Sequence, residues 1–295
     1  MNAQLGSGHT PETLFFTKMQ GLGNDFMVID ATQFKLALTP SQIQAWSDRR
    51  FGVGFDQLLL VELTQTPGVD FRYRIFNADG SEVQQCGNGA RCFARFVVDK
   101  GLTDKHTIKV ETASGVIVLS VLDDGWVRVN MGVPQFAPEA LPFLAEKTQL
   151  RYPLALADET LNIGAVSMGN PHALVEVNDI TQAPVAKWGP LIEAHARFPE
   201  RVNVGFAQVV SPQQIDLRVY ERGAAETLAC GTGACAAMVI LHQWQQVDDA
   251  VTVRLPGGPL QVAWSGAPGS PVWMTGPAQT VYEGQMAWPA NLKTD

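Results

Sequence analysis

The chain has 295 residues, of which 46% are apolar and 17% are charged, a composition typical of a globular protein with room for two domains. Its 21 basic and 29 acidic residues give a net charge of −8, and the absence of any Lys/Arg cluster argues against a nucleic-acid-binding protein. The four cysteines are too few for a disulfide framework, and a cytosol would keep them reduced.

The N-terminal segment, residues 1–13, is polar and has neither the basic start nor the apolar core of a signal peptide. We expect it to be a disordered lead-in. The longest helix-like apolar stretch, residues 234–241, is too short to cross a bilayer. A soluble, cytoplasmic protein without a membrane or nucleic-acid partner is therefore expected.

A first domain is expected over residues 14–133, built mostly of strands. Residues 39–46 predict a surface helix with a Ser or Thr cap and an early proline. Residues 90–100 are apolar nearly all round, which is typical of a helix buried by its surroundings. Alternating or β-branched runs predict strands over residues 107–112, 115–121 and 126–130.

A second domain is expected over residues 134–276, after a boundary marked by Pro134, Pro138 and Pro142. Its predicted strands are residues 173–177, 214–220 and 251–255, and residues 234–245 predict a second buried helix. The C-terminal segment, residues 277–295, is expected to return to the first domain.

The two halves repeat each other. Cys86-Gly-Asn-Gly-Ala parallels Cys230-Gly-Thr-Gly-Ala, and each motif leads into one of the two buried helices. Upstream, residues 50–57 parallel 201–208, and residues 23–26 parallel 169–172. Three matched blocks in the same order indicate a duplicated domain. The predicted fold is therefore α/β, with two pseudo-symmetric domains, each a mixed, mostly antiparallel sheet or barrel around a central helix.

The position of Cys86 and Cys230, each at the start of a helix, suits acid–base chemistry. Free first-turn N–H groups and the helix dipole stabilise a thiolate there and also form a carboxylate site. Two such starts could place a thiolate on one face of a carbon and a thiol on the other, which would invert its configuration. Cys92 and Cys235, inside the helices, are interpreted as small buried hydrophobic residues.

Other functions fit less well. Four-thiolate zinc sites usually use C-x(2–4)-C pairs, whereas the spacings here are C-x5-C and C-x4-C, so no metal is expected. A thiol–disulfide redox protein would be expected to carry C-x-x-C, which this chain lacks. A non-catalytic amino-acid-binding protein remains a further alternative.

Six blocks together resemble the diaminopimelate epimerase family over about residues 15–285. They are Gly21-Leu-Gly-Asn-Asp-Phe, Phe76-Asn-Ala-Asp-Gly-Ser-Glu, Cys86-Gly-Asn-Gly-Ala-Arg-Cys, Gly169-Asn-Pro-His, Tyr220-Glu-Arg-Gly and Ala229-Cys-Gly-Thr-Gly-Ala. The resemblance implies a cofactor-independent isomerase of lysine and peptidoglycan-precursor biosynthesis that interconverts LL- and meso-2,6-diaminopimelate. It also implies two α/β domains with a substrate cleft between them that closes on binding, and a homodimer with Tyr282 at its interface.

Matching the motifs gives each predicted site residue a role. The resemblance implies that Cys86 and Cys230 are the two catalytic bases and that His172 and Glu221 tune the thiols. The residues that it implies bind substrate are Asn24, Gln57, Asn77, Gly87, Asn88, Asn170, Asn203, Glu221, Arg222, Gly231 and Thr232.

Several of these residues also admit structural interpretations. Asn24, Asn77 and Asn203 could be turn residues, Glu221 and Arg222 a solvated pair, and His172 a structural residue. The acidic residues Asp25, Asp56 and Asp79 are interpreted as turn or capping residues.

The chain departs from the family pattern at Gln20, where His is common, and at Ala225, where Gly is common. Proline or hydroxyproline racemases share the predicted fold and the paired cysteines, and they are the nearest alternative. A single-headed substrate would not need the pair Glu221 and Arg222. Phenazine-type isomerases, a more distant alternative, should lack both thiols.

Overall fold

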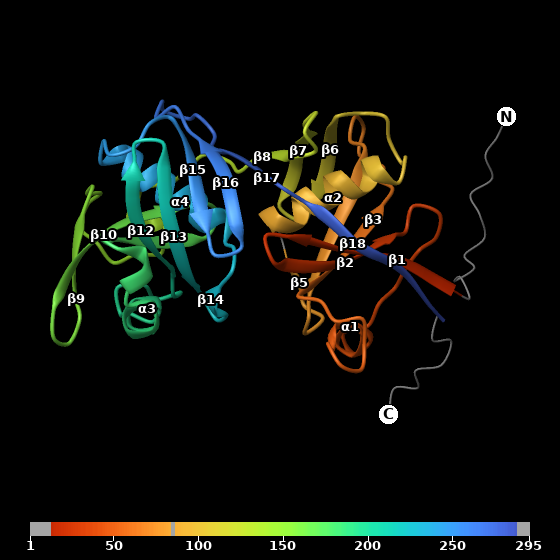
Figure 1. The fold of residues 1–295 in the computed structure, drawn as a ribbon, viewed down its shortest axis with the longest axis horizontal. Helices are drawn as coiled ribbons and strands as arrows, with labels where there is room; N and C mark the ends of the chain where they lie inside the picture. Colours follow the sequence, from red (N-terminus) through yellow and green to blue (C-terminus); the bar gives the residue numbers. More distant parts are fainter. Residues whose placement is uncertain (1–12, 84–85, 288–295) are drawn as a thin grey trace. The chain divides into compact units, whose positions relative to one another are not determined.

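The computed structural model describes residues 13–83 and 86–287. The chain forms two compact units, one from residues up to 129 together with residues from 277 onwards, and one from residues 130–276 (Figure 1). The second unit therefore begins a few residues before the proline-rich segment. The lead-in predicted for residues 1–13 lies outside the described residues except for Thr13, which begins a strand.

In its described residues, the first unit contains nine strands and two helices. In chain order these are β1 (Thr13–Gly21), β2 (Asn24–Asp30), α1 (Pro40–Ser47), β3 (Gln57–Glu62), β4 (Phe71–Asn77), β5 (Glu82–Val83), α2 (Gly87–Asp99), β6 (Thr107–Thr112), β7 (Gly115–Val121), β8 (Val127–Asn130) and β18 (Gln279–Ala287). Neighbouring strands follow the order β18-β1-β2-β3-β4-β6-β7-β8, with β5 paired to β4. The pairs β2/β3 and β4/β6 are parallel, and the others are antiparallel.

The second unit has the same plan. Its elements are η1 (Pro138–Ala140), β9 (Tyr152–Ala155), β10 (Thr160–Ser167), β11 (Pro171–Glu176), η2 (Ile180–Gln182), α3 (Val185–Glu193), β12 (Asn203–Ser211), β13 (Gln214–Glu221), β14 (Ala225–Thr227), α4 (Gly231–Gln243), β15 (Ala250–Leu255), β16 (Gly258–Ala263) and β17 (Trp273–Gly276). Its strand order is β9-β10-β11-β12-β13-β15-β16-β17, with β14 paired to β13. The parallel pairs are β11/β12 and β13/β15, at the positions equivalent to those of the first unit. The predicted internal repeat and fold class are confirmed.

The two buried helices occupy equivalent places. Helix α2 packs against β1, β2, β3, β7 and β18, and α4 packs against β10, β11, β12, β13, β15, β16 and β17. The sequence predicted both helices but placed their starts three residues late, at Ala90 and Ala234, because periodicity does not register the glycines of the first turn. In the structure each helix begins directly after its cysteine.

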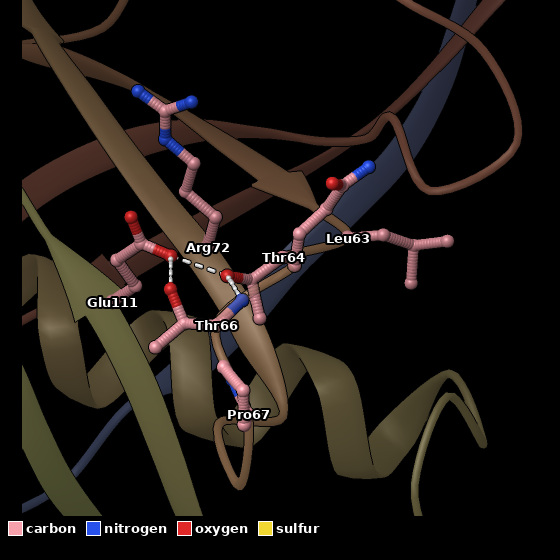
Figure 2. Close-up of a pocket in the computed structure, with 7 residues that line it drawn as sticks. Leu63, Thr64, Thr66, Pro67, Arg72 and Glu111 are labelled. Carbon is pink, nitrogen blue, oxygen red and sulfur yellow. Dashed lines mark hydrogen bonds between the residues drawn. The ribbon is translucent and has the colours of Figure 1, made fainter.

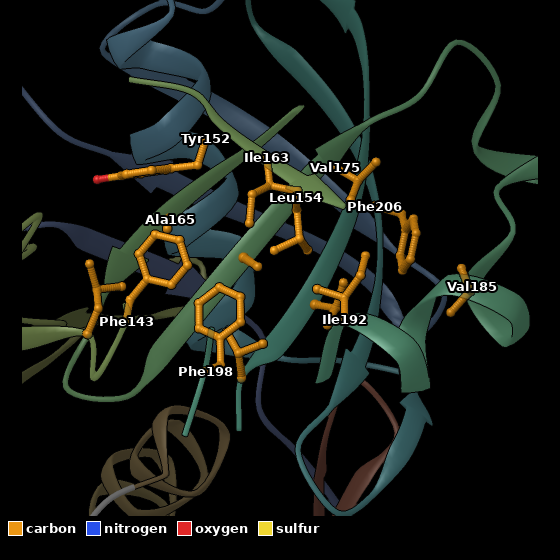
Figure 3. Close-up of a cluster of buried hydrophobic side chains, with 14 of the residues drawn as sticks. Phe143, Tyr152, Leu154, Ile163, Ala165, Val175, Val185, Ile192, Phe198 and Phe206 are labelled. Atoms are coloured by element: carbon orange, nitrogen blue, oxygen red, sulfur yellow. The ribbon is translucent and has the colours of Figure 1, made fainter. Parts of the chain in front are cut away.

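Helix α1 follows its sequence signals closely. Thr39 is the N-cap, Pro40 is the first helical residue, and Gln42 completes a capping box with Thr39. Its apolar face places Ile43 and Trp46 in a core cluster with side chains from β1, β2 and β3. The corresponding core of the second unit joins β9, β10, β11 and β12 to α3 and includes the stacked rings of Phe143 and Phe198 (Figure 3). These cores fix the strand ends from which the site residues project.

Candidate functional site: two cysteine half-sites

The predicted site residues divide between the two units. The first unit carries Asn24, Gln57, Asn77, Cys86, Gly87 and Asn88. The second unit carries Asn170, His172, Asn203, Glu221, Arg222, Cys230, Gly231 and Thr232. Within each unit these residues lie at strand ends next to the start of the buried helix. We call the two sets the first and the second half-site.

Cys86 is the N-cap of α2. Its sulfur accepts a hydrogen bond from the N–H of Gly89 at 3.5 Å, and its carbonyl oxygen accepts one from Ala90 at 2.8 Å. An N–H donor to sulfur favours the thiolate over the thiol. Glycine is required at position 89 because a Cβ there would lie 2.4 Å from the buried hydroxyl of Tyr73. The first turn of α2 thus fits closely against strand β4 and holds the sulfur at the helix end.

Asn24 connects Cys86 to an ion-pair network. Its amide oxygen lies 3.9 Å from the Cys86 sulfur and accepts a hydrogen bond from Asn88 Nδ2 at 3.3 Å. Its amide nitrogen donates to Asp56 Oδ2 at 2.9 Å, which fixes the orientation of the amide. An oxygen facing the sulfur accepts from S–H and favours the thiol, so Asn24 and Gly89 act on Cys86 in opposite directions.

Asp25 and Asp56 do more than the turn or capping role that the sequence suggested. Arg49 pairs with Asp25 at 2.8 Å and with Asp56 at 2.7 Å, and Lys18 pairs with Asp25 at 2.6 Å. Burial alone would raise the pKa of Asp25, but the hydrogen bonds and charges of Arg49 and Lys18 lower it well below its usual range. Asp79 has the expected turn role, accepting from the N–H and hydroxyl of Ser81.

Gln57 and Asn77 face each other across β3 and β4. Gln57 Nε2 donates to Asn77 Oδ1 at 2.9 Å, and Asn77 Nδ2 donates to Ser81 Oγ at 3.2 Å. Gln57 Oε1 is a buried acceptor with no partner in the part of the chain that the structure describes. A buried acceptor of this kind is costly unless a donor arrives, and a ligand ammonium group would supply one.

Cys230 is the N-cap of α4 and is buried. Its sulfur lies 3.6 Å from the Thr232 hydroxyl. Burial and the negative charge of Glu221 raise the pKa of Cys230 well above its usual range, although the Thr232 hydroxyl and the Gly233 N–H oppose this shift. Without a ligand, Cys230 is therefore a thiol at neutral pH.

His172 is buried and neutral. Burial, with a smaller contribution from the positive charge of Arg222, lowers its pKa from 6.5 to about 3. Its Nε2 lies 3.0 Å from Asn170 Oδ1, an oxygen that can only accept, so Nε2 carries the proton. Asn170 Nδ2 in turn donates to the Thr232 hydroxyl at 3.3 Å. A hydrogen-bond chain thus runs from His172 through Asn170 to the residue that contacts Cys230.

Glu221 and Arg222 end β13 and lead into a tight turn. Glu221 accepts a hydrogen bond from the Thr227 hydroxyl, and Arg222 Nη1 donates to the carbonyl oxygen of Glu200 at 3.0 Å. Asn203 is buried; its Oδ1 accepts from the Arg222 N–H at 3.0 Å and its Nδ2 donates to Pro171 O at 3.1 Å. Asn203 therefore braces the Arg222 backbone, and because its amide can make further hydrogen bonds, its direct contact with substrate stays a prediction.

Sequence reasoning missed several residues that support these half-sites. Arg91 is fully buried in α2 and its Nε donates to Pro277 O at 3.1 Å, where the chain re-enters the first unit. An arginine in the first turns of a helix that is otherwise largely apolar was the available signal. Glu193 contacts the turn after Glu221, and Arg201 pairs with Glu193. Neither residue gave a sequence signal.

Cys92 and Cys235 are fully buried inside their helices, as predicted. Burial raises the pKa of Cys92 to about 12, so it stays a thiol. Within residues 13–83 and 86–287, no three His, Cys, Asp or Glu side chains gather as metal ligands would, and no helix there is long and apolar enough to span a membrane.

One surface hollow of the first unit contains none of the predicted site residues. It has a volume of about 460 Å³ and lies between the β3–β4 loop and β6. Glu111 there accepts hydrogen bonds from the hydroxyls of Thr64 and Thr66, which lower its pKa (Figure 2). Both contacts end on Oε2 of Glu111 and fasten the β3–β4 loop to β6.

Comparisons with known proteins give a consistent result. A family model described as diaminopimelate epimerase matches residues 16–137 and 164–281. Proteins named diaminopimelate epimerase from Pseudomonas entomophila and Laribacter hongkongensis are each 58% identical to the chain, and both alignments cover 92% of it and 99% of the relative. One from Azoarcus sp. is 59% identical, covering 93% of this chain and 99% of that protein.

Solved structures share the fold at much lower identity. A PhzF-family phenazine biosynthesis protein from Bacillus anthracis has a TM-score of 0.67 and 18% identity, covering 94% of this chain and 99% of that chain. A hydroxyproline epimerase from Agrobacterium vitis has a TM-score of 0.67 and 15% identity, covering 94% and 93%. Members of both alternative families considered from the sequence, the hydroxyproline racemases and the phenazine-type isomerases, therefore share this fold.

Proposed function

Because this chain belongs to the diaminopimelate epimerase family, we propose that it interconverts LL- and meso-2,6-diaminopimelate by moving a proton between the two faces of one α-carbon. The observation that carries the proposal is the pair of cysteines, Cys86 and Cys230, each the N-cap of a buried helix in an equivalent position of a duplicated fold. The activity belongs to lysine and peptidoglycan-precursor biosynthesis.

The reacting carboxylate is bound by backbone N–H groups. Gly87 and Asn88 begin α2, and Gly231 and Thr232 begin α4, so four first-turn residues carry N–H groups without partners inside their own helices. Such groups and the dipoles of both helices stabilise the carboxylate and the negative charge that develops at the α-carbon. Neither a cofactor nor a metal is needed in this scheme.

The two thiols exchange one proton through the substrate. In one direction a thiolate removes the α-proton from its face, and the thiol of the other cysteine delivers a proton to the opposite face. The cysteine that removed the proton is then a neutral thiol, and the cysteine that delivered one is a thiolate. The reverse reaction can follow directly. The resting state has Cys230 as the thiol, since burial and Glu221 raise its pKa, and Cys86 as the base, with the Gly89 N–H on its sulfur. One substrate molecule must engage both half-sites.

The non-reacting end of the substrate carries a second ammonium and a second carboxylate. We assign Glu221 to the ammonium and Arg222 to the carboxylate, which a guanidinium can bind through two parallel hydrogen bonds. The amides of Asn24, Gln57, Asn77 and Asn170 add neutral donors and acceptors without burying further charge. Asn203 supports this assignment indirectly, since its amide oxygen holds the Arg222 N–H. His172 acts on Cys230 as a neutral partner at the end of a hydrogen-bond chain and not as a cation.

The protein is proposed to work as a homodimer through strands β1 and β18. Phe15, Val281 and Tyr282 expose large apolar side chains there, with Tyr282 44% exposed. Burying such a surface against a second copy would be favourable. Analytical ultracentrifugation should give twice the chain mass, and a monomer would remove this part of the proposal. The cytoplasmic location and the absence of nucleic-acid and membrane partners stay predictions.

Deuterated water tests the reaction itself. Incubating the purified chain with LL-diaminopimelate in D2O, without pyridoxal phosphate or metal, should place one deuterium at the inverted α-carbon of the meso product. Proline and hydroxyproline should give no exchange, because they lack the distal ammonium and carboxylate. Activity that required pyridoxal phosphate, or that disappeared with a chelator, would exclude the two-thiol mechanism.

A further inference from the structure

Glu193, the last residue of α3, is in an unfavourable place for a carboxylate. It is 5% exposed, and it lies at the end of a helix that carries partial negative charge. Its Oε1 accepts two hydrogen bonds, from Arg201 Nη1 at 3.1 Å and from the N–H of Gly223 at 3.2 Å. One buried oxygen thus joins the end of α3 to two loops that are 22 residues apart in the chain.

Arg201 and Gly223 adopt backbone conformations that fit this contact. Arg201 has φ +62°, a left-handed conformation that is unfavourable for a non-glycine residue. Gly223 has φ +76°, where glycine carries little penalty. The strain at Arg201 brings its guanidinium to Glu193 and directs the chain into Asn203. The Glu193 carboxylate thus combines three unfavourable features: its burial, its place at the negative end of a helix, and the strained backbone of its partner Arg201.

The turn that Glu193 contacts carries the two charged residues of the second half-site. Residues 222–224 join β13, which ends at Glu221, to β14, and a second contact holds this turn, from the Arg222 N–H to Asn203 Oδ1 at 3.0 Å. The Arg222 side chain makes a further contact with the loop before β12, because its Nη1 donates a hydrogen bond to Glu200 O at 3.0 Å. The loop before β12 and the turn after β13 are thus fastened to each other and to the end of α3.

The first unit has the same joint without the charges. There the last residue of the equivalent helix α1 is Ser47, whose hydroxyl donates to Ala78 O at 3.1 Å in the turn after β4. The neutral Asn77 and Ala78 stand there at the positions that Glu221 and Arg222 occupy in the second unit. The charged brace therefore occurs in the unit that has a charged pair at these two positions.

We infer that Glu193 and Arg201 form a positioning pair that sets the geometry of Glu221 and Arg222 toward the distal ammonium and carboxylate of the substrate. The inference rests on the proposed function, because it assigns the brace to recognition of a two-headed amino acid. The pair does not touch the reacting carbon. Loosening it should therefore weaken substrate binding and leave proton transfer at the two sulfurs largely intact.

Four variants test the pair. Glu193→Ala and Arg201→Gly should each raise the KM for LL-diaminopimelate about tenfold and change kcat less than threefold. Glu193→Gln keeps an acceptor for the Gly223 N–H and should raise KM only about threefold. Glu176→Gln is the matched control. Glu176 also accepts hydrogen bonds from an arginine, Arg151, and from an amide group, that of Gln246. It lies at the other end of β11 from His172, the residue that pairs with Asn203. Its kinetics should be unchanged.

The coupling of the two residues is measured by combining variants. If they act as one brace, the double variant Glu193→Gln/Arg201→Gly should have a KM about tenfold above wild type, the value of Arg201→Gly alone, whereas independent roles would multiply the two effects to about thirtyfold. Arg201→Gly keeps the test decisive if Glu193→Ala does not fold, because glycine adopts φ +62° without strain.

A second readout does not depend on activity. Amide hydrogen exchange of the segment 221–227 should be about tenfold faster in Glu193→Ala and Arg201→Gly than in the wild type, and unchanged in the control. Wild-type protein that fails to epimerise diaminopimelate would overturn the proposed function, while the exchange rates would still decide whether the pair holds the turn. Unchanged KM together with unchanged exchange in both variants would overturn the inference.

Discussion

The two half-sites share a backbone plan and differ in their surroundings. Cys86 is partly exposed, and its neighbour Asn24 is held by an ion-pair network of Lys18, Asp25, Arg49 and Asp56. Cys230 is buried, and its neighbours are a carboxylate and a hydrogen-bond chain from a neutral histidine. The duplicated topology preserved the helix start that supports each sulfur, while the side chains around it diverged. In the proposed mechanism this difference assigns the base to the first half-site, and the acid and the charged residues Glu221 and Arg222 to the second.

The largest expected effect comes from removing either sulfur. Cys86→Ala and Cys230→Ala should each lower kcat for epimerisation by at least about a thousandfold, because each direction of reaction needs both a base and an acid. Circular dichroism should show an unchanged fold, since each position is a helix N-cap with its backbone hydrogen bonds intact. A variant that retained near-normal turnover would show that its half-site is not part of the proton path.

The buried histidine should make the second unit sensitive to acid. Its pKa is about 3 when folded and 6.5 when unfolded, so its contribution to stability is complete above pH 6.5 and is lost as pH falls toward 3. Between pH 7.5 and pH 5 the free energy of unfolding should fall by about 2 kcal/mol from this residue alone. His172→Phe copies Phe26, its counterpart in the first unit, and should remove that part of the decline in urea titrations. If the free energy of unfolding fell equally with pH in the wild type and in His172→Phe, His172 would not have a lowered pKa.

The two cysteines should differ in reactivity. At pH 8 iodoacetamide should modify Cys86 at least about tenfold faster than Cys230, because burial and Glu221 disfavour the Cys230 thiolate. Glu221→Gln should narrow the gap by accelerating Cys230. Mass spectrometry of the modified peptides measures both rates, and the buried Cys92 and Cys235 serve as unreactive references. Faster modification of Cys230 would reverse the proposed assignment of base and acid in the resting enzyme.

The smallest effect concerns backbone strain next to the recognition residues. Ala225 has φ +60°, which explains why glycine is common at this position in the family pattern. Ala225→Gly should raise the free energy of unfolding by about 1 kcal/mol, a gain that denaturant titration can resolve. Ser81 occupies the corresponding position of the first unit and does not have a positive φ. Ser81→Gly should therefore bring no comparable gain in the free energy of unfolding. Destabilisation by Ala225→Gly would show that the unfolded-state entropy of glycine outweighs the relief of strain.

Local patterns predicted the elements well. The capping signals at Thr39 and Pro40 located α1, and the runs at residues 107–112 and 115–121 matched β6 and β7. The repeated Cys-Gly-polar-Gly-Ala motif predicted that both halves would adopt one fold with a cysteine at each helix start. These signals are readable because periodicity, caps and turns depend on residues close together in the chain.

Contacts between distant residues were not predictable in this way. The Asp25 and Asp56 carboxylates meet Lys18 and Arg49 only after β1, β2 and the loop before β3 assemble. The contacts of Asn203 with Arg222 and Pro171 likewise could not be predicted from its motif. Single charged residues such as Glu193 carry no pattern that would distinguish a buried brace from a surface residue.

By itself, the sequence determined the duplicated architecture, the two helix-capping cysteines and the family of the enzyme, because those depend on short-range patterns that occur twice in one chain. Tertiary structure alone decided the protonation states and the bracing. Burial sets the pKa of Cys230 and of His172, and charges brought together from distant segments set the orientation of Asn24 and of the turn at Glu221. Such effects depend on distance in space and on exclusion of water, and neither is written in the order of residues along the chain.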